Sequence, residues 1–129
     1  YMDDWLSHLD YLMELYKAFL NPKVDWLITS AINNPHPVWT DDIETGNNKL
    51  GSPSCLTFRN KFKDNLLFDE RMSWLLDCDY YKGMYKLYGE PKILWGQNVI
   101  MGIHDGQMTH ILTDEEKLAE YKIMNEKYA

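Results

Sequence analysis

The stretch Val-Asp-Trp-Leu-Ile-Thr-Ser at residues 24–30 is short, apolar and partly β-branched, which is the pattern of a strand buried inside a sheet. Apolar residues before it recur at helical spacing and predict a helix over residues 7–20. Ser7 and Asp10 form a weak helix-start box, and Asn21-Pro22 ends the helical pattern. A helix followed by a buried strand is typical of an α/β domain.

The rest of the chain continues this α/β pattern. Residues 33–53 are rich in Pro, Gly, Asn and Asp and predict a long loop, and loops of this length are often functional. We expect Leu118, Tyr121 and Met124 to face inward from a last helix that begins at Thr113 and continues to Tyr128. The further elements predicted are a strand over 54–59, a helix over 76–88 closed by Gly89 and Pro91, and strands over 93–95 and 99–103.

Composition limits the class of protein. The 129 residues suit one domain, over 1–129, and 45% hydrophobic residues are enough to build a core. A net charge of −7 disfavours binding to nucleic acid or to anionic membranes. The chain shows no apolar run long enough to cross a bilayer and no signal-peptide layout. Cys55 and Cys78 could form one disulfide, but two reduced, buried thiols in a cytoplasmic protein are the preferred interpretation.

Two groups of acidic residues could carry chemistry. Asp3 and Asp4 are adjacent carboxylates that could hold Mg²⁺ or Mn²⁺ and leave coordination positions for phosphate oxygens. Asp77, at the start of the predicted helix over 76–88, could act as a general base. The alternative for both groups is that the acids only stabilise helix N-termini, and we expect Asp79 to share in capping even if Asp77 is functional.

Histidine and aromatic side chains give weaker indications. His104 lies at a predicted strand end, where it could bind a metal or phosphate or only complete a loop. Trp39 and Trp74 lie beside loop signals and are candidates for stacking on a ligand. The tyrosine pairs at 80–81 and at 85 and 88 have helical spacing, which favours packing.

Taken in order, these motifs resemble the second half of a family 2 glycosyltransferase of the GT-A fold. The resemblance covers nearly the whole chain and is strongest over residues 51–109. It rests on Asp3-Asp4-Trp5, the helix and buried strand, Gly51-Ser52-Pro53-Ser54, the strand after it, Phe68-Asp69-Glu70-Arg71, Trp74-Leu75-Leu76-Asp77-Cys78-Asp79 and the segment Gly-Ile-His-Asp-Gly-Gln at 102–107.

The resemblance implies roles for particular residues. Asp3 and Asp4 match the DXD-type motif, whose Mn²⁺ or Mg²⁺ bridges the diphosphate of a sugar nucleotide. Asp77 matches the general base that deprotonates the acceptor hydroxyl, although Leu76 stands where the family has Glu. His104 matches a histidine that contacts the metal or the diphosphate in some members. The loop of Gly51, Ser52 and Pro53 matches the one near donor sugar and acceptor, and Trp74 would border the acceptor pocket.

The implied protein is an inverting hexosyltransferase that uses a nucleotide-sugar donor and a carbohydrate or other hydroxyl acceptor. Its fold would be a partial GT-A fold, a mixed sheet in a three-layer α/β/α arrangement. Because the chain starts at Tyr1, we expect it to be a fragment with little activity alone. A homodimer or a separate N-terminal half would then cover the open sheet edge. Two alternatives stay open, namely a carbohydrate-binding or protein-interaction module without catalysis, and an α/β domain whose acids are only helix caps.

Overall fold

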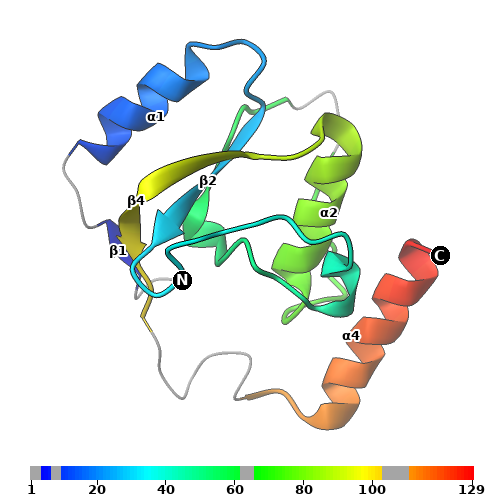
Figure 1. The fold of residues 1–129 in the computed structure, drawn as a ribbon. Helices are drawn as coiled ribbons and strands as arrows, with labels where there is room; N and C mark the ends of the chain where they lie inside the picture. The colour runs from blue at the N-terminus through cyan, green and yellow to red at the C-terminus, as the bar shows by residue number, and fades with distance from the viewer. Residues whose placement is uncertain (1–3, 7–9, 62–65, 103–110) are drawn as a thin grey trace.

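The computed structural model describes residues 4–6, 10–61, 66–102 and 111–129. They form a small mixed α/β domain built on a curled four-stranded sheet (Figure 1). Its strands are β1 (Trp5–Leu6), β2 (Trp26–Ala31), β3 (Leu56–Phe58) and β4 (Lys92–Ile100), in the spatial order β1-β4-β2-β3. The helices are α1 (Tyr11–Phe19), α2 (Leu76–Tyr88) and α4 (Asp114–Lys127), with the short 3-10 turns η1 (Ile43–Thr45) and η2 (Pro53–Cys55).

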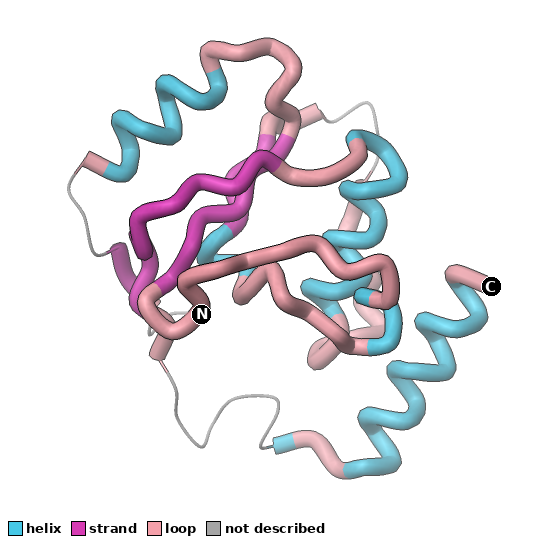
Figure 2. The backbone as a smooth tube through the Cα atoms, viewed as in Figure 1, coloured by secondary structure: helices cyan, strands magenta, loops and turns pink. Residues whose placement is uncertain are grey.

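The sheet combines parallel and antiparallel pairs. β2 runs parallel to β4, while β3 pairs antiparallel with β2 and β1 antiparallel with β4. All six residues of β2 are buried, which explains why its sequence is a nearly continuous apolar run without alternation. The long connection from β2 to β3 runs from the sheet to α2 and back, with η1 at its far end (Figure 2).

β4 is one strand with an internal irregularity. Thr29 pairs with Leu94, but Ala31 pairs with Val99, so β4 inserts extra residues between these two pairs. The prediction of two separate strands over 93–95 and 99–103 was therefore wrong, and residues 103–110 lie outside the described part of the chain. Gly96 lies in the irregular part of β4, after which pairing with β2 resumes.

Helices cover both faces of the sheet. Tyr11 of α1 is buried against the face of the sheet that carries Thr57 and Thr29. On the other face, the rings of Trp26 and Tyr81 of α2 lie 6.1 Å apart. Successive strand residues point to opposite faces, so β2 presents Trp26 to α2 and Thr29 to α1. This arrangement agrees with the predicted mixed α/β architecture.

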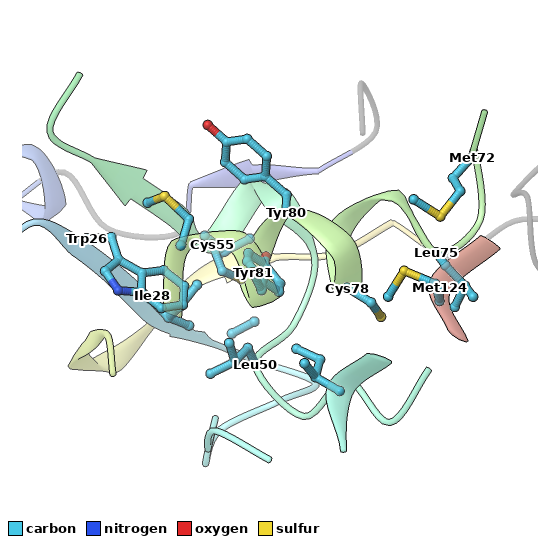
Figure 3. Close-up of a cluster of buried hydrophobic side chains, with 14 residues drawn as sticks. Trp26, Ile28, Leu50, Cys55, Met72, Leu75, Cys78, Tyr80, Tyr81 and Met124 are labelled. Carbon is cyan, nitrogen blue, oxygen red and sulfur yellow. The ribbon is translucent and has the colours of Figure 1, made fainter. Parts of the chain in front are cut away.

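The main core lies between the sheet and α2 (Figure 3). Trp26, Ile28 and Tyr81 pack there together with the two cysteines, which are both free. Burial raises the pKa of the Cys55 thiol to about 11, and that of the Cys78 thiol is raised further for the same reason. Both thiols are therefore protonated at neutral pH, as expected for inert core cysteines.

The helix ends agree with the sequence signals, but one predicted face does not. α2 has the predicted bounds and ends at Gly89, whose φ of 79° few other residues adopt easily. Thr113 caps α4 by accepting a hydrogen bond from the Glu116 amide at 3.2 Å. Met124 is buried as predicted, but Leu118 is 65% exposed, and Glu120 takes the inward position instead.

Within the described residues, no helix has the length and apolar character needed to cross a membrane.

Candidate functional site

Asp4 lies beside the loop that precedes β3. Its Oδ2 accepts hydrogen bonds from the hydroxyl of Ser54 at 2.7 Å and from that of Ser52 at 3.3 Å. Its Oδ1 accepts from the Gly102 amide at 2.7 Å. Asp4 reaches Gly102 because β1 pairs with the end of β4, where Trp5 lies opposite Ile100. The carboxylate is thus fixed between the loop and the end of β4.

Asp77 meets the same loop from the first turn of α2. Its Oδ2 accepts a hydrogen bond from Asn48 Nδ2 at 3.0 Å, and its Oδ1 accepts from the Cys78 amide at 2.8 Å. Asn48 also donates to the carbonyl of Gly51 at 3.1 Å and accepts from the Gly51 amide at 3.2 Å. Tyr81 of α2 donates to the same Gly51 carbonyl at 3.1 Å.

Residues 48–54, which we call the bridging loop, therefore contact both predicted acids. Asp4 holds the Ser52 and Ser54 end, and Asp77 holds the Asn48 end through its amide. The structure thus brings Asp4, Gly51, Ser52 and Asp77 to one region. Pro53 lies within the loop as the first residue of η2.

Three other predicted site residues are not placed in this region by any contact. Asp3 and His104 lie outside the described residues. Trp74 turns its ring toward α4, where it lies edge-on to Tyr121 at 5.4 Å, with Lys117 at 5.1 Å from the ring. Its role at an acceptor pocket stays a prediction. Trp39, the other stacking candidate, stacks on Tyr85 at 4.2 Å and so contributes to packing.

Burial sets the electrostatics of Asp77. Desolvation raises the pKa of its carboxyl above the ordinary value, and hydrogen bonds from Cys78 and Asn48 oppose this shift. Both of these partners are neutral, so neither offers the carboxylate a compensating positive charge. A raised pKa brings a carboxylate closer to the range in which a general base works best near neutral pH.

A different carboxylate binds the turn that leads into α2, including its N-cap residue Leu75. Glu120 of α4 is buried and accepts hydrogen bonds from the amides of Ser73, Trp74 and Leu75 at 2.7 to 3.0 Å. Asp79 does lie in the first turn of α2, where the helix dipole favours an acid, but its carboxylate does not bond the helix amides. Asp79 is only 3% exposed and instead binds Lys127 at 2.8 Å and the hydroxyl of Tyr128 at 2.6 Å.

Asp4 has the donor chemistry for a hard cation, but the described residues supply few companions. Carboxylate oxygens suit Mg²⁺ and Mn²⁺, and Mg²⁺ is often held by one or two protein carboxylates together with substrate phosphates. Among the described residues, no group of three or more His, Cys, Asp or Glu side chains converges on one point. Asp4 is the one predicted metal ligand in the described part of the chain, so a cation held there would need further ligands, such as substrate phosphates.

Two cavities lie away from both acids. One, of about 920 Å³, is lined by residues of β2, of the bulge in β4 and of the loop that follows β2. The other, of about 410 Å³, lies beside β3 and α2. Neither is lined by Asp4 or Asp77.

Comparison with known proteins gives no assignment. No protein-family model, no curated protein and no solved structure matches the chain. A functional interpretation therefore depends on the residues and their geometry.

Asn48 is the residue of this region that the sequence did not single out. It lies in the predicted loop, 29 positions before Asp77, and no spacing rule connects the two. The signal present in the sequence is the pair Asn47-Asn48 close before Gly51, since Asn side chains often bond the backbone of turns. That pattern indicates a turn but not its partner on α2.

Proposed function

We propose that this chain is the acceptor-side part of a metal-assisted glycosyltransferase of the family 2 type with a GT-A fold. It would transfer a sugar from a nucleoside-diphosphate sugar to an acceptor hydroxyl. The observation that supports this most is that Asp4 and Asp77 hold the two ends of one short loop. The proposed donor side and the proposed base therefore border a common stretch of backbone.

Asp77 is the proposed general base. The Cys78 amide orients its Oδ1 and Asn48 orients its Oδ2, and a carboxylate oxygen has a second lone pair with which it can accept a proton. One such lone pair would take the proton of the acceptor hydroxyl. The hydroxyl oxygen then forms a bond to the anomeric carbon, and the bond from that carbon to the diphosphate oxygen breaks, with its electron pair leaving on the diphosphate. One base is enough for this inverting displacement.

Asp4 is the proposed metal ligand, together with Asp3 and His104 as the resemblance implies. When bound, a divalent cation would neutralise charge on the leaving diphosphate. Ser52 and Ser54 fix the orientation of the Asp4 carboxylate in the cation's absence, because both donate to its Oδ2. The same serines lie at the loop end nearest the proposed donor.

The test is a thermal shift of the chain with Mn²⁺ and a panel of nucleoside diphosphates. A ligand that binds only the folded state raises the melting temperature, and we expect one nucleotide to do so only with Mn²⁺. Asp4→Asn should abolish this shift, whereas Asp77→Asn should keep it. Glu70→Gln, an exposed acid elsewhere, is the matched control. An equal shift for Asp4→Asn and the unchanged chain would contradict the metal role.

The base role of Asp77 needs a measurement of transfer. Sugar transfer would be assayed with the nucleotide sugar that the thermal shifts select, and Asp77→Asn should lose about a hundredfold or more in rate, the usual share of a general base. Unchanged transfer by Asp77→Asn would rule out this base.

A second candidate is a carbohydrate-binding module without catalysis. The observation that favours it is the larger cavity, which carries an exposed tryptophan and includes neither acid. Sugar binding that needs no metal and survives Asp77→Asn, with no transfer by the unchanged chain, would select this alternative.

A further inference from the structure

The larger cavity has an amphipathic and uncharged lining. It is formed by Ser30, Ile32, Pro35, His36, Trp95, Gly96 and Gln97. None of these is an Asp, Glu, Lys or Arg, although such residues make up 26% of the chain. The lining therefore offers an aromatic surface and hydrogen-bonding groups, but no formal charge, to whatever occupies it.

Trp95 is the dominant surface of this cavity. Its side chain is 57% exposed, although it belongs to a central strand of the sheet. The ring of His36 lies 6.2 Å from it at an angle of 56°, so the two rings form adjacent, inclined walls. Gly96, the next residue, adds no side chain that could cover the indole.

The backbone that presents Trp95 is strained and held by specific contacts. Gln97 has a φ of 53°, which is unfavourable for a residue with a side chain. Its amide donates to Ser30 Oγ at 2.8 Å, and buried Asn98 donates to Thr29 Oγ1 at 3.0 Å. Two hydrogen bonds that β4 donates to side chains of β2 thus hold the bulge in the conformation in which the side chain of Trp95 is exposed.

We propose that this cavity binds a neutral pyranose sugar. The C–H face of a pyranose ring packs on an indole, and its hydroxyls can bond polar groups such as the His36 ring and the side-chain amide of Gln97. A nucleotide or another phosphate ester fits poorly, because none of the described residues that line the cavity is a Lys or Arg that could balance its charge. The inference is independent of the catalytic proposal, since Asp4 and Asp77 are not in this lining.

The experiment is a titration of the full chain, labelled with ¹⁵N at tryptophan, with four neutral trisaccharides: maltotriose, cellotriose, mannotriose and triacetylchitotriose. The indole N–H signal of Trp95 is identified by its loss in Trp95→Ala. We expect at least one trisaccharide to move this signal saturably, without added metal. Trp95→Ala should weaken that sugar's binding, measured by calorimetry, about tenfold or more. Tyr16→Ala removes an aromatic side chain of similar exposure on α1, 64%, and should bind like the unchanged chain.

Three results would overturn the proposal: no trisaccharide moves the Trp95 signal, Trp95→Ala binds as well as the unchanged chain, or uridine monophosphate moves the signal where the sugars do not. If Trp95→Ala fails to fold, His36→Ala on the exposed loop replaces it and should also weaken binding. Asp77→Asn is included as a separate arm and should bind the trisaccharide normally. Loss of transfer in that variant with binding retained would show that the two sites act separately.

Discussion

Asp77 carries a carboxylate that is fixed by two neutral donors and desolvated by its surroundings. The sequence placed it correctly at the start of a helix, because Leu76 begins the helical pattern and Gly89 ends it. Its contact with Asn48 could not be predicted, since it depends on how a long loop folds back onto α2. The raised pKa follows from that fold and not from the local sequence.

The raised pKa of Asp77 predicts a pH-dependent effect of Asp77→Asn on stability. The ordinary pKa of an unfolded Asp is about 3.9, so the folded chain holds the Asp77 proton more tightly than the unfolded chain. The folded state therefore loses stability through this group as pH rises from about 4 through the raised pKa. Asn does not titrate, so the free energy of unfolding of Asp77→Asn should rise relative to the unchanged chain between pH 4 and 7.

Urea unfolding at pH 4, 5.5 and 7 measures this difference. Asn at 77 also loses one hydrogen bond, which adds a constant offset at every pH. Glu70→Gln serves again as the exposed control and should show no such trend. A difference between Asp77→Asn and the unchanged chain that stays the same across the three pH values would contradict the prediction.

At the scale of elements, α4 stabilises α2 by capping it from another part of the chain. Helix N-termini leave amides without intrahelical partners, and α2 has no side-chain cap of its own. The carboxylate of Glu120, 45 or more residues away, accepts from the amide of Leu75, the N-cap residue of α2, and from the amides of Ser73 and Trp74 in the turn before it. Its negative charge also suits the positive end of the α2 dipole.

Removing this carboxylate should be costly. Glu120→Ala leaves buried amides without acceptors, and we expect it to lower the free energy of unfolding by about 3 kcal/mol. Glu120→Gln keeps one acceptor oxygen and should cost about half as much. Glu126→Ala, an exposed acid on the same helix, should change stability by less than about 0.5 kcal/mol. Denaturant titration checks all three, and equal midpoints for Glu120→Ala and Glu126→Ala would exclude the capping role.

The elements also show where sequence patterns suffice. Helix-stop and helix-start residues predicted two boundaries correctly. Gly89 and Pro91 mark the C-terminal end of α2, and Thr113 marks the start of α4. Periodicity failed for the inward face of α4, because it ranks Leu118 as a core residue and Glu120 as a surface residue. In the structure Leu118 is exposed and Glu120 is buried, because the carboxylate of Glu120 accepts a hydrogen bond from Leu75, the N-cap residue of α2. Such a contact is visible only once the two helices are side by side.

At the scale of the whole molecule, apolar side chains remain uncovered around α1 and β1. Trp5 and Leu6 are exposed on β1, whose partner strand among the described residues is β4. One exposed side of α1 adds further large apolar residues, namely Leu12, Met13, Tyr16 and Leu20. Both a strand edge with no partner in the described part of the chain and an exposed apolar side of a helix favour association with another chain.

We therefore expect the chain to self-associate as its concentration rises. Sedimentation velocity should show a mass above the monomer, and the double variant Leu12→Lys with Tyr16→Lys should shift it toward the monomer. Leu87→Lys with Leu118→Lys changes two exposed residues on other helices and should leave the association intact. A monomer at every concentration for the unchanged chain would show that this surface stays free.

The candidate site was predictable in part. Asp4, Gly51, Ser52 and Asp77 were chosen from motif order, and the structure places them around the bridging loop. Asn48, Tyr81 and the bulge before Val99 were not chosen, because their contacts join segments far apart in sequence. Motif order identifies residue types that carry chemistry, whereas the supporting contacts depend on the folded chain.

The bridging loop has a consequence for how its two ends respond to ligands. Ser54 and Asn48 are six residues apart, and the carbonyl of Gly51 between them accepts hydrogen bonds from Asn48 and Tyr81. The segment of chain that joins the two acids is therefore short and held in place. A ligand that draws Asp4 away from its serines would release one anchor and leave the other strained. If ligands bind as proposed, a ligand at one acid would change the affinity of the other acid for its own ligand, and the effect would be equal in both directions.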